Sequence, residues 1–272
     1  MKLTKKLPLV CLLAAVVAAP VHAGAIHDAS LFTNVLGGND DLSTEFVGLG
    51  FSALINGTTY SDTCVNNNGN ITFTGCLGTF TPAAISTGGF GPIIAPFFAD
   101  VDTRASSSDV VRYGAATLGG RNVFGVNYIN VGVFSQLPIL NSFQLILTDR
   151  SDIAAGDFDI QFNYDSILWE TGQASGGNSS GLGGTSALAG YWTSATSNAT
   201  LPGSLVNGAL IDGGPNALIS NSLNSNVLGQ YNFSVRGGVV QPPTGVPEPM
   251  SLALVGLALA AAGAASRRKA AA

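Results

Sequence analysis

The chain has 272 residues, a formal net charge of -5 and only 10% charged residues. Most of its positive charge sits near the two ends, and removing those end groups takes away six positive charges and one negative charge (Lys2, Lys5, Lys6, Glu248, Arg267, Arg268 and Lys269). The body that remains carries -10 and has no lysine. Nucleic-acid binding needs cations that displace counterions from the phosphates, so this balance argues against nucleic acid as a partner.

The first 23 residues have the three-part pattern of a secretory signal peptide. Three lysines precede an apolar run from Leu7 to Ala19, and Val21-His22-Ala23 supplies the small residues of a cleavage site. We expect cleavage after Ala23, with cleavage after Ala25 as the alternative. The mature chain is then exported from the cytoplasm.

Removal of the signal peptide also changes the cysteine count. Cys11 is lost, so Cys64 and Cys76 remain as a pair in an oxidising compartment. The sequence predicts a disulfide between them, with two free thiols as the alternative. Closing so short a loop adds about 2 to 3 kcal/mol of stability in the chain-entropy model.

Strand patterns run through the body, residues 24–240, and no amphipathic helix is evident. Apolar and polar residues alternate from Asp157 to Tyr164, and the alternation returns from Tyr231 to Val235. More continuous apolar runs, from Val123 to Val133 and from Phe143 to Leu147, suit buried strands. Turn-rich segments such as Asn66-Asn67-Asn68-Gly69 separate them. The body is therefore predicted to be all-β, as a single domain resembling a β-sandwich.

Two acidic residues are candidates for a metal site. Asp100 and Asp102 flank Val101, so on a strand both carboxylates point to the same face, where they either bind a cation or repel each other. One interpretation is a calcium site completed by loop carbonyls. The alternative is an ion pair with Arg104 that fixes the end of the strand, and the lack of EF-hand spacing favours it. No other cofactor is predicted.

The sequence offers little for catalysis. His27 is the only imidazole left after processing, and the two cysteines are predicted to be oxidised, which removes most general-base and nucleophile arrangements. Residues 177–181 match the G-x-S-x-G pattern, but they lie in a Gly/Ser-rich loop and not between a strand and a helix. We therefore predict that the protein is not an enzyme.

The C-terminal part has the layout of a sorting and anchoring device. Residues 241–249 form a proline-rich spacer, residues 250–265 an uncharged apolar run, and residues 266–272 a tail with the basic cluster Arg267-Arg268-Lys269. As a helix the run spans about 24 Å, less than the ~30 Å hydrocarbon core, but snorkelling and local thinning can close this gap. We expect a transmembrane helix with a cytoplasmic tail; a buried core helix is the alternative.

These three parts, in this order, resemble the PEP-CTERM sorting region of Gram-negative bacteria. Pro247, Glu248 and Pro249 match its signature tripeptide. The resemblance implies an exosortase-type processing enzyme as a partner and transient anchoring in the membrane. It also implies delivery to the cell surface or the extracellular matrix, with its exopolysaccharide.

The body has a second resemblance, strongest in the segment Ile94-Ala95-Pro96-Phe97-Phe98-Ala99-Asp100-Val101-Asp102-Thr103-Arg104. Weaker matches occur at residues 70–73, 80–82, 110–113, 141–147 and 189–192. The body resembles a nidogen-type (NIDO) extracellular domain, the module of nidogens, tectorins and membrane mucins, although Phe98 stands where that family often has tryptophan. The resemblance implies an extracellular role in cell-matrix adhesion.

Together these features predict a secreted, surface-sorted, non-enzymatic protein. It would act in cell-matrix adhesion or as a component of the exopolysaccharide or extracellular matrix, and an extracellular polysaccharide or matrix component would be its partner. The alternative is a carbohydrate-active or ice-binding surface protein.

Overall fold

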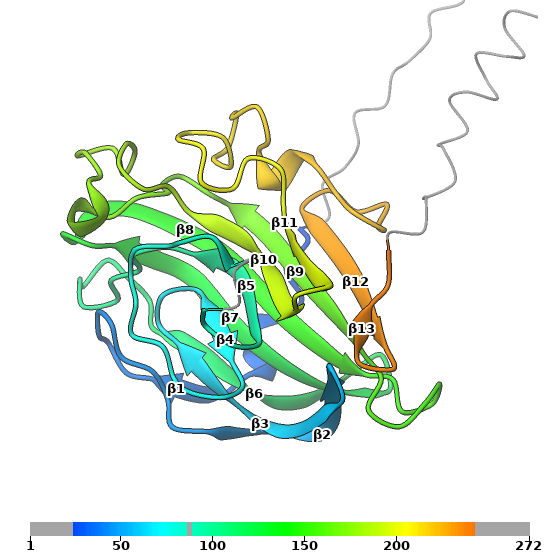
Figure 1. The fold of residues 1–272 in the computed structure, drawn as a ribbon. Helices are drawn as coiled ribbons and strands as arrows, with labels where there is room; N and C mark the ends of the chain where they lie inside the picture. Colours follow the sequence, from blue (N-terminus) through cyan, green and yellow to red (C-terminus); the bar gives the residue numbers. More distant parts are fainter. Residues whose placement is uncertain (1–23, 86–88, 243–272) are drawn as a thin grey trace, which may run out of the picture.

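The computed structural model describes residues 24–85 and 89–242 as an all-β domain (Figure 1). Three short 3-10 helices in these ranges are η1 (Ala29–Leu31), η3 (Gln173–Ser175) and η4 (Leu218–Ser220). The strands in the same ranges are β1 (Asn34–Leu36), β2 (Val47–Ile55), β3 (Thr58–Asn66), β4 (Asn70–Thr72), β5 (Ile93–Phe98), β6 (Val111–Leu118), β7 (Arg121–Val133), β8 (Leu137–Asp149), β9 (Phe158–Ser166), β10 (Leu188–Ser194), β11 (Ser197–Thr200), β12 (Gln230–Arg236) and β13 (Val239–Val240).

The strands form two antiparallel sheets that pack as a sandwich, as the sequence predicts (Figure 1). One sheet has the order β1-β6-β7-β8-β9-β12-β13, and the other has the order β11-β10-β5-β4-β3-β2. The predicted apolar runs lie within β7 and β8, and the alternating segments are β9 and β12. Their apolar side chains face the core, since Phe158, Ile160 and Val235 are fully buried.

An aromatic cluster joins the two sheets in the core. Phe97 of β5 packs against Phe143 of β8, with ring centroids 5.3 Å apart, and edge-on against Trp169 at 5.7 Å. Tyr128 of β7 stacks on Phe143 at 4.7 Å, and its hydroxyl donates to the carbonyl of Asn66 at 2.7 Å. These contacts fix the sheets relative to each other at the end where β5 and β7 finish.

The segment before β1 covers the outer face of the seven-stranded sheet. There a row of amides crosses three neighbouring strands: Gln144 donates to Asn127 at 2.8 Å, and Asn163 donates to Gln144 at 3.1 Å. The backbone N–H of His27 donates to Gln144 at 3.0 Å, and its ring Nε2 lies 2.6 Å from Oε1 of Gln161. The side-chain amides thus hold the N-terminal segment on the sheet.

The predicted disulfide between Cys64 and Cys76 is present. It ties β3 to the loop that follows β4. No helix in residues 24–85 and 89–242 is long and apolar enough to cross a membrane. The signal peptide, the transmembrane segment, the sorting tripeptide Pro247-Glu248-Pro249 and the basic cluster all lie outside the described residues.

Substituting Cys64 by serine should lower the free energy of unfolding by about 3 kcal/mol, because the open loop gives the unfolded chain more conformations. Chemical denaturation measures this loss. Wild-type protein treated with reductant should show the same loss, whereas the variant should not respond to reductant. Labelling of two thiols in the native, unreduced protein would contradict the prediction.

Candidate cation site between the two sheets

The site forms where the chain leaves β5 and crosses from one sheet to the other. Val101 makes an isolated antiparallel bridge with Val133 at the end of β7. On either side of it, the N–H of Phe134 donates to the carbonyl of Asp100 at 3.0 Å, and the N–H of Asp102 donates to the carbonyl of Gly132 at 3.1 Å. Backbone hydrogen bonds therefore hold Asp100 between the sheets.

The turn Asn66-Asn67-Asn68-Gly69, which joins β3 to β4, is buried beside this crossing. Asn67 Nδ2 donates to the carbonyls of Asp40 and Val101, both at 2.6 Å. Asn68 Nδ2 donates to Asp41 Oδ1 at 2.9 Å, and Asn68 Oδ1 accepts the N–H of Val101 at 2.9 Å. The turn thus fastens the segment around Asp40 and Asp41 to the segment around Asp100.

Gly69 allows this turn to approach β5 closely. Its φ is +75°, and a Cβ there would lie 1.7 Å from the carbonyl oxygen of Phe97. The backbone also pairs at this point, because the N–H of Phe97 donates to the carbonyl of Gly69 at 3.2 Å. Only glycine meets both requirements at this position.

A third segment, between β1 and β2, brings two more carboxylates. Asn39 and Thr103 lock it in place: the N–H of Asn39 donates to Thr103 Oγ1, and the N–H of Thr103 donates to the carbonyl of Asn39, each at 2.9 Å. As a result, Asp40, Asp41 and Asp100 each place a carboxylate oxygen within 4.8 Å of the others. We call these three residues the acidic cluster.

The two predicted metal ligands therefore have different surroundings. Asp100 belongs to the acidic cluster, whereas Asp102 is paired with Arg104, whose Nε and Nη2 donate to its two oxygens at 2.8 and 2.7 Å. Arg104 also reaches Asp40 Oδ2 at 2.9 Å. The ion pair of the alternative interpretation is thus present at Asp102, beside the cluster that contains Asp100.

Sequence reasoning missed Asp40 and Asp41. The only local signal is an acidic pair after Asn39 in a turn-rich stretch, far from Asp100 along the chain. Asp40 and Asp41 come close to Asp100 because the side chains of Asn67 and Asn68 hold both segments. These two side chains bond to Asp40 and Asp41, 27 residues earlier in the chain. They also bond to Val101, 33 or 34 residues later.

Burial and like charges raise the pKa values of Asp40 and Asp100. Desolvation, followed by the charges of Asp40, Asp41 and Asp102, raises the pKa of Asp100 to about 7, although Arg104 opposes this. Desolvation is also the largest cause for Asp40, whose pKa rises to about 6. A group of carboxylate oxygens in such a setting is suited to a hard divalent cation.

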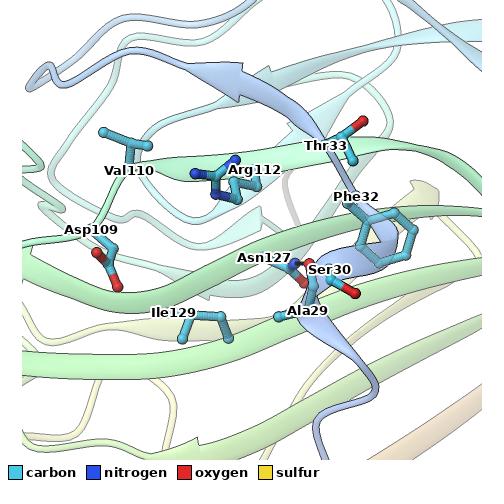
Figure 2. Close-up of a pocket in the computed structure, with 9 residues that line it drawn as sticks. All are labelled: Ala29, Ser30, Phe32, Thr33, Asp109, Val110, Arg112, Asn127 and Ile129. Atoms are coloured by element: carbon cyan, nitrogen blue, oxygen red, sulfur yellow. Dashed lines mark hydrogen bonds between the residues drawn. The ribbon is translucent and has the colours of Figure 1, made fainter.

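A separate cavity of about 510 Å³ lies on the outer side of the seven-stranded sheet, beside the N-terminal segment (Figure 2). Arg112 and Asp109 contribute charged groups to it, and Asn127 is already held by the carbonyl of Ala29 at 2.8 Å. The residues that line it are Ala29, Ser30, Phe32, Thr33, Asp109, Val110, Arg112, Asn127 and Ile129. None of them belongs to the acidic cluster.

Comparison with known proteins identifies relatives of this chain. A family model described as "NIDO related" matches residues 23–210, which include every segment of the acidic cluster. The chain is 31% identical to the alpha-tectorins of Mus musculus and Homo sapiens over 235 residues, or 76% of this chain, and 32% identical to that of Gallus gallus over 232 residues, or 75%. It spans 10% of the length of these relatives. No solved structure matches it. By the extent of the family match, the chain belongs to the NIDO-related family.

Proposed function

We propose that the protein is a secreted, non-enzymatic component of the cell surface or extracellular matrix, with a role in cell-matrix adhesion. The match to the NIDO-related family over residues 23–210 carries this proposal, because that family resemblance implies an extracellular role. The disulfide between Cys64 and Cys76 supports it, since such bonds persist in oxidising compartments.

The proposal includes the route to the surface. The signal peptide would export the chain, and the C-terminal helix would then hold it in the membrane of a Gram-negative cell. An exosortase-type enzyme would recognise Pro247-Glu248-Pro249 and process the tail. The protein would then be handed to the exopolysaccharide or another matrix component. The resemblance of residues 247–272 to a PEP-CTERM region supports this route.

Deleting residues 250–272 should move the protein from the cell-surface and matrix fractions into the periplasm or the medium, because both the apolar anchor and the basic cluster are lost. Fractionation followed by immunoblotting measures the distribution. As a matched control, alanines at Pro247, Glu248 and Pro249 should leave the protein in the membrane, because the anchor remains and only recognition is lost. Equal distributions of the truncated and full-length proteins would contradict the proposed route.

A further inference from the structure

The acidic cluster has too few positive partners. Asp40, Asp41, Asp100 and the neighbouring Asp102 bring four carboxylates together, and among the described residues Arg104 is the cation that contacts them. Its Nε and Nη2 groups both donate to the carboxylate of Asp102 in a bidentate pair. Buried carboxylates need a compensating charge, so the ionised cluster lacks positive charge.

The other arginines of this part of the chain that form ion pairs are committed elsewhere. Arg121 and Arg150 pair with Asp152, and Arg150 and Arg236 pair with Asp159. The body has no lysine. Arg112 lines the separate cavity on the outer side of the seven-stranded sheet. Among the described residues, Arg104 is therefore the cation of the cluster, and a bound cation would supply the charge that the ionised carboxylates lack.

Two carboxylate oxygens of the cluster also lack hydrogen bonds. Asp100 is only 2% exposed, and no described residue donates to its Oδ2; the same is true of the buried Oδ1 of Asp40. The carboxylate of Asp100 is enclosed: its backbone carbonyl accepts a hydrogen bond from Phe134, and the carboxylate packs on Gly172, where a Cβ would lie 2.2 Å from Oδ2. The cost of leaving such oxygens unpaired points to a ligand that binds them.

The spacing and chemistry of these oxygens fit one kind of ligand. Calcium binds six to eight oxygens at about 2.3–2.6 Å, so ligands on opposite sides of the ion lie about 5 Å apart. The three carboxylate oxygens of the cluster fall within 4.8 Å of one another. No histidine or cysteine belongs to the cluster, which disfavours zinc and other metals that prefer nitrogen or sulfur.

We propose that Asp40, Asp41 and Asp100 bind one calcium ion, with neighbouring carbonyls and water completing its shell. The ion joins the segment between β1 and β2 to the crossing after β5, and so links parts of the chain that are 60 residues apart. A site that forms only when these segments come together binds the folded state and not the unfolded one. Calcium therefore stabilises the domain.

Calcium titration of the exported full-length protein, purified in detergent and stripped with EDTA, tests this proposal. At a hundredfold excess over Kd, the midpoint of thermal unfolding should rise by about 5–10 °C. Calorimetric titration with calcium should give one site per chain. Magnesium should give the smaller shift, because it demands a tighter octahedral shell.

Two variants locate the ion. Asp100→Asn and Asp41→Asn should each abolish the calcium-induced shift. In EDTA, Asp100→Asn should melt at or above the wild-type temperature, because the amide removes a buried charge without a partner. Adding calcium should then raise the melting temperature of the wild type above that of Asp100→Asn. A purely structural role of Asp100 does not produce this reversal. The matched control Asp62→Asn, at an exposed position of β3, should keep the full shift.

Three results would overturn the proposal: no calcium response in the wild type, a retained response in both cluster variants, or an equal or larger response to magnesium. If Asp100→Asn does not fold, calorimetric titration of Asp41→Asn decides the matter, and undiminished binding there counts against the site. None of these results bears on export or surface sorting.

Discussion

Replacing Phe97 by alanine should lower the free energy of unfolding by about 3–5 kcal/mol. Phe97 is fully buried on β5 and contacts both Phe143 of the opposite sheet and Trp169. Its removal leaves a cavity at the point where the sheets meet, and the surrounding rings are held by their own contacts and cannot collapse into it. Denaturant titration with the disulfide intact measures the change.

Phe46→Ala is the matched control, because Phe46 is 50% exposed between β1 and β2. The same substitution should lower the free energy of unfolding by less than about 1 kcal/mol there. Folding removes less apolar surface from water at Phe46 than at Phe97. Equal losses for the two variants would show that Phe97 does not lie between two packed sheets, and the sandwich would have to be reconsidered.

Without calcium, the protein should lose stability as the pH rises from 5 to 7. The folded pKa of Asp100 is raised from 3.8 to about 7, so the folded state keeps a proton that the unfolded state releases. Unfolding stability therefore falls between these two pKa values and levels off above the higher one. Each pH unit in that window costs up to about 1.4 kcal/mol per proton, which gives about 2 kcal/mol for Asp100 between pH 5 and 7. Asp40, raised to about 6, acts in the same direction over the lower part of the window.

Denaturant titrations in EDTA across this pH range measure the decline. Asp100→Asn should flatten it, because the amide does not titrate, whereas Asp62→Asn should leave the slope of the wild type unchanged. An identical slope in wild type and Asp100→Asn would mean that Asp100 titrates at its ordinary pKa and is not held in a desolvated, acidic setting.

The strands could be predicted because their signal is local. The alternation from Asp157 to Tyr164 depends only on the two-residue period of a strand, and that period survives in β9 with its apolar side chains buried. The order of strands in the sheets could not be predicted in this way. Pairing depends on contacts between distant segments, such as that of β1 with β6, and periodicity does not record them.

The acidic cluster was predictable only in part, for the same reason. The spacing of Asp100 and Asp102 around Val101 indicates Asp100 as a candidate ligand, but its partners Asp40 and Asp41 come from another segment. The turn from Asn66 to Gly69 brings them together, and its composition is typical of any surface turn. The sequence around the turn does not indicate that these asparagines are buried. Nor does it indicate that their side-chain amides bond to the segment of Asp40 and Asp41 and to Val101.

The amide row on the outer face of the seven-stranded sheet sets an order of assembly. His27 precedes the first strand of the domain, yet its ring partner Gln161 lies 134 residues later on β9. The His27 ring cannot make this contact until β9 has paired with β8, whereas the contacts of the same segment with Asn127 of β7 and Gln144 of β8 need only earlier strands. Cys64 and Cys76, only 12 residues apart, can pair much earlier. The end of the domain that is synthesised first therefore completes its contacts only after β9 has formed, and a chain stopped before β9 would leave the His27 ring without its partner Gln161.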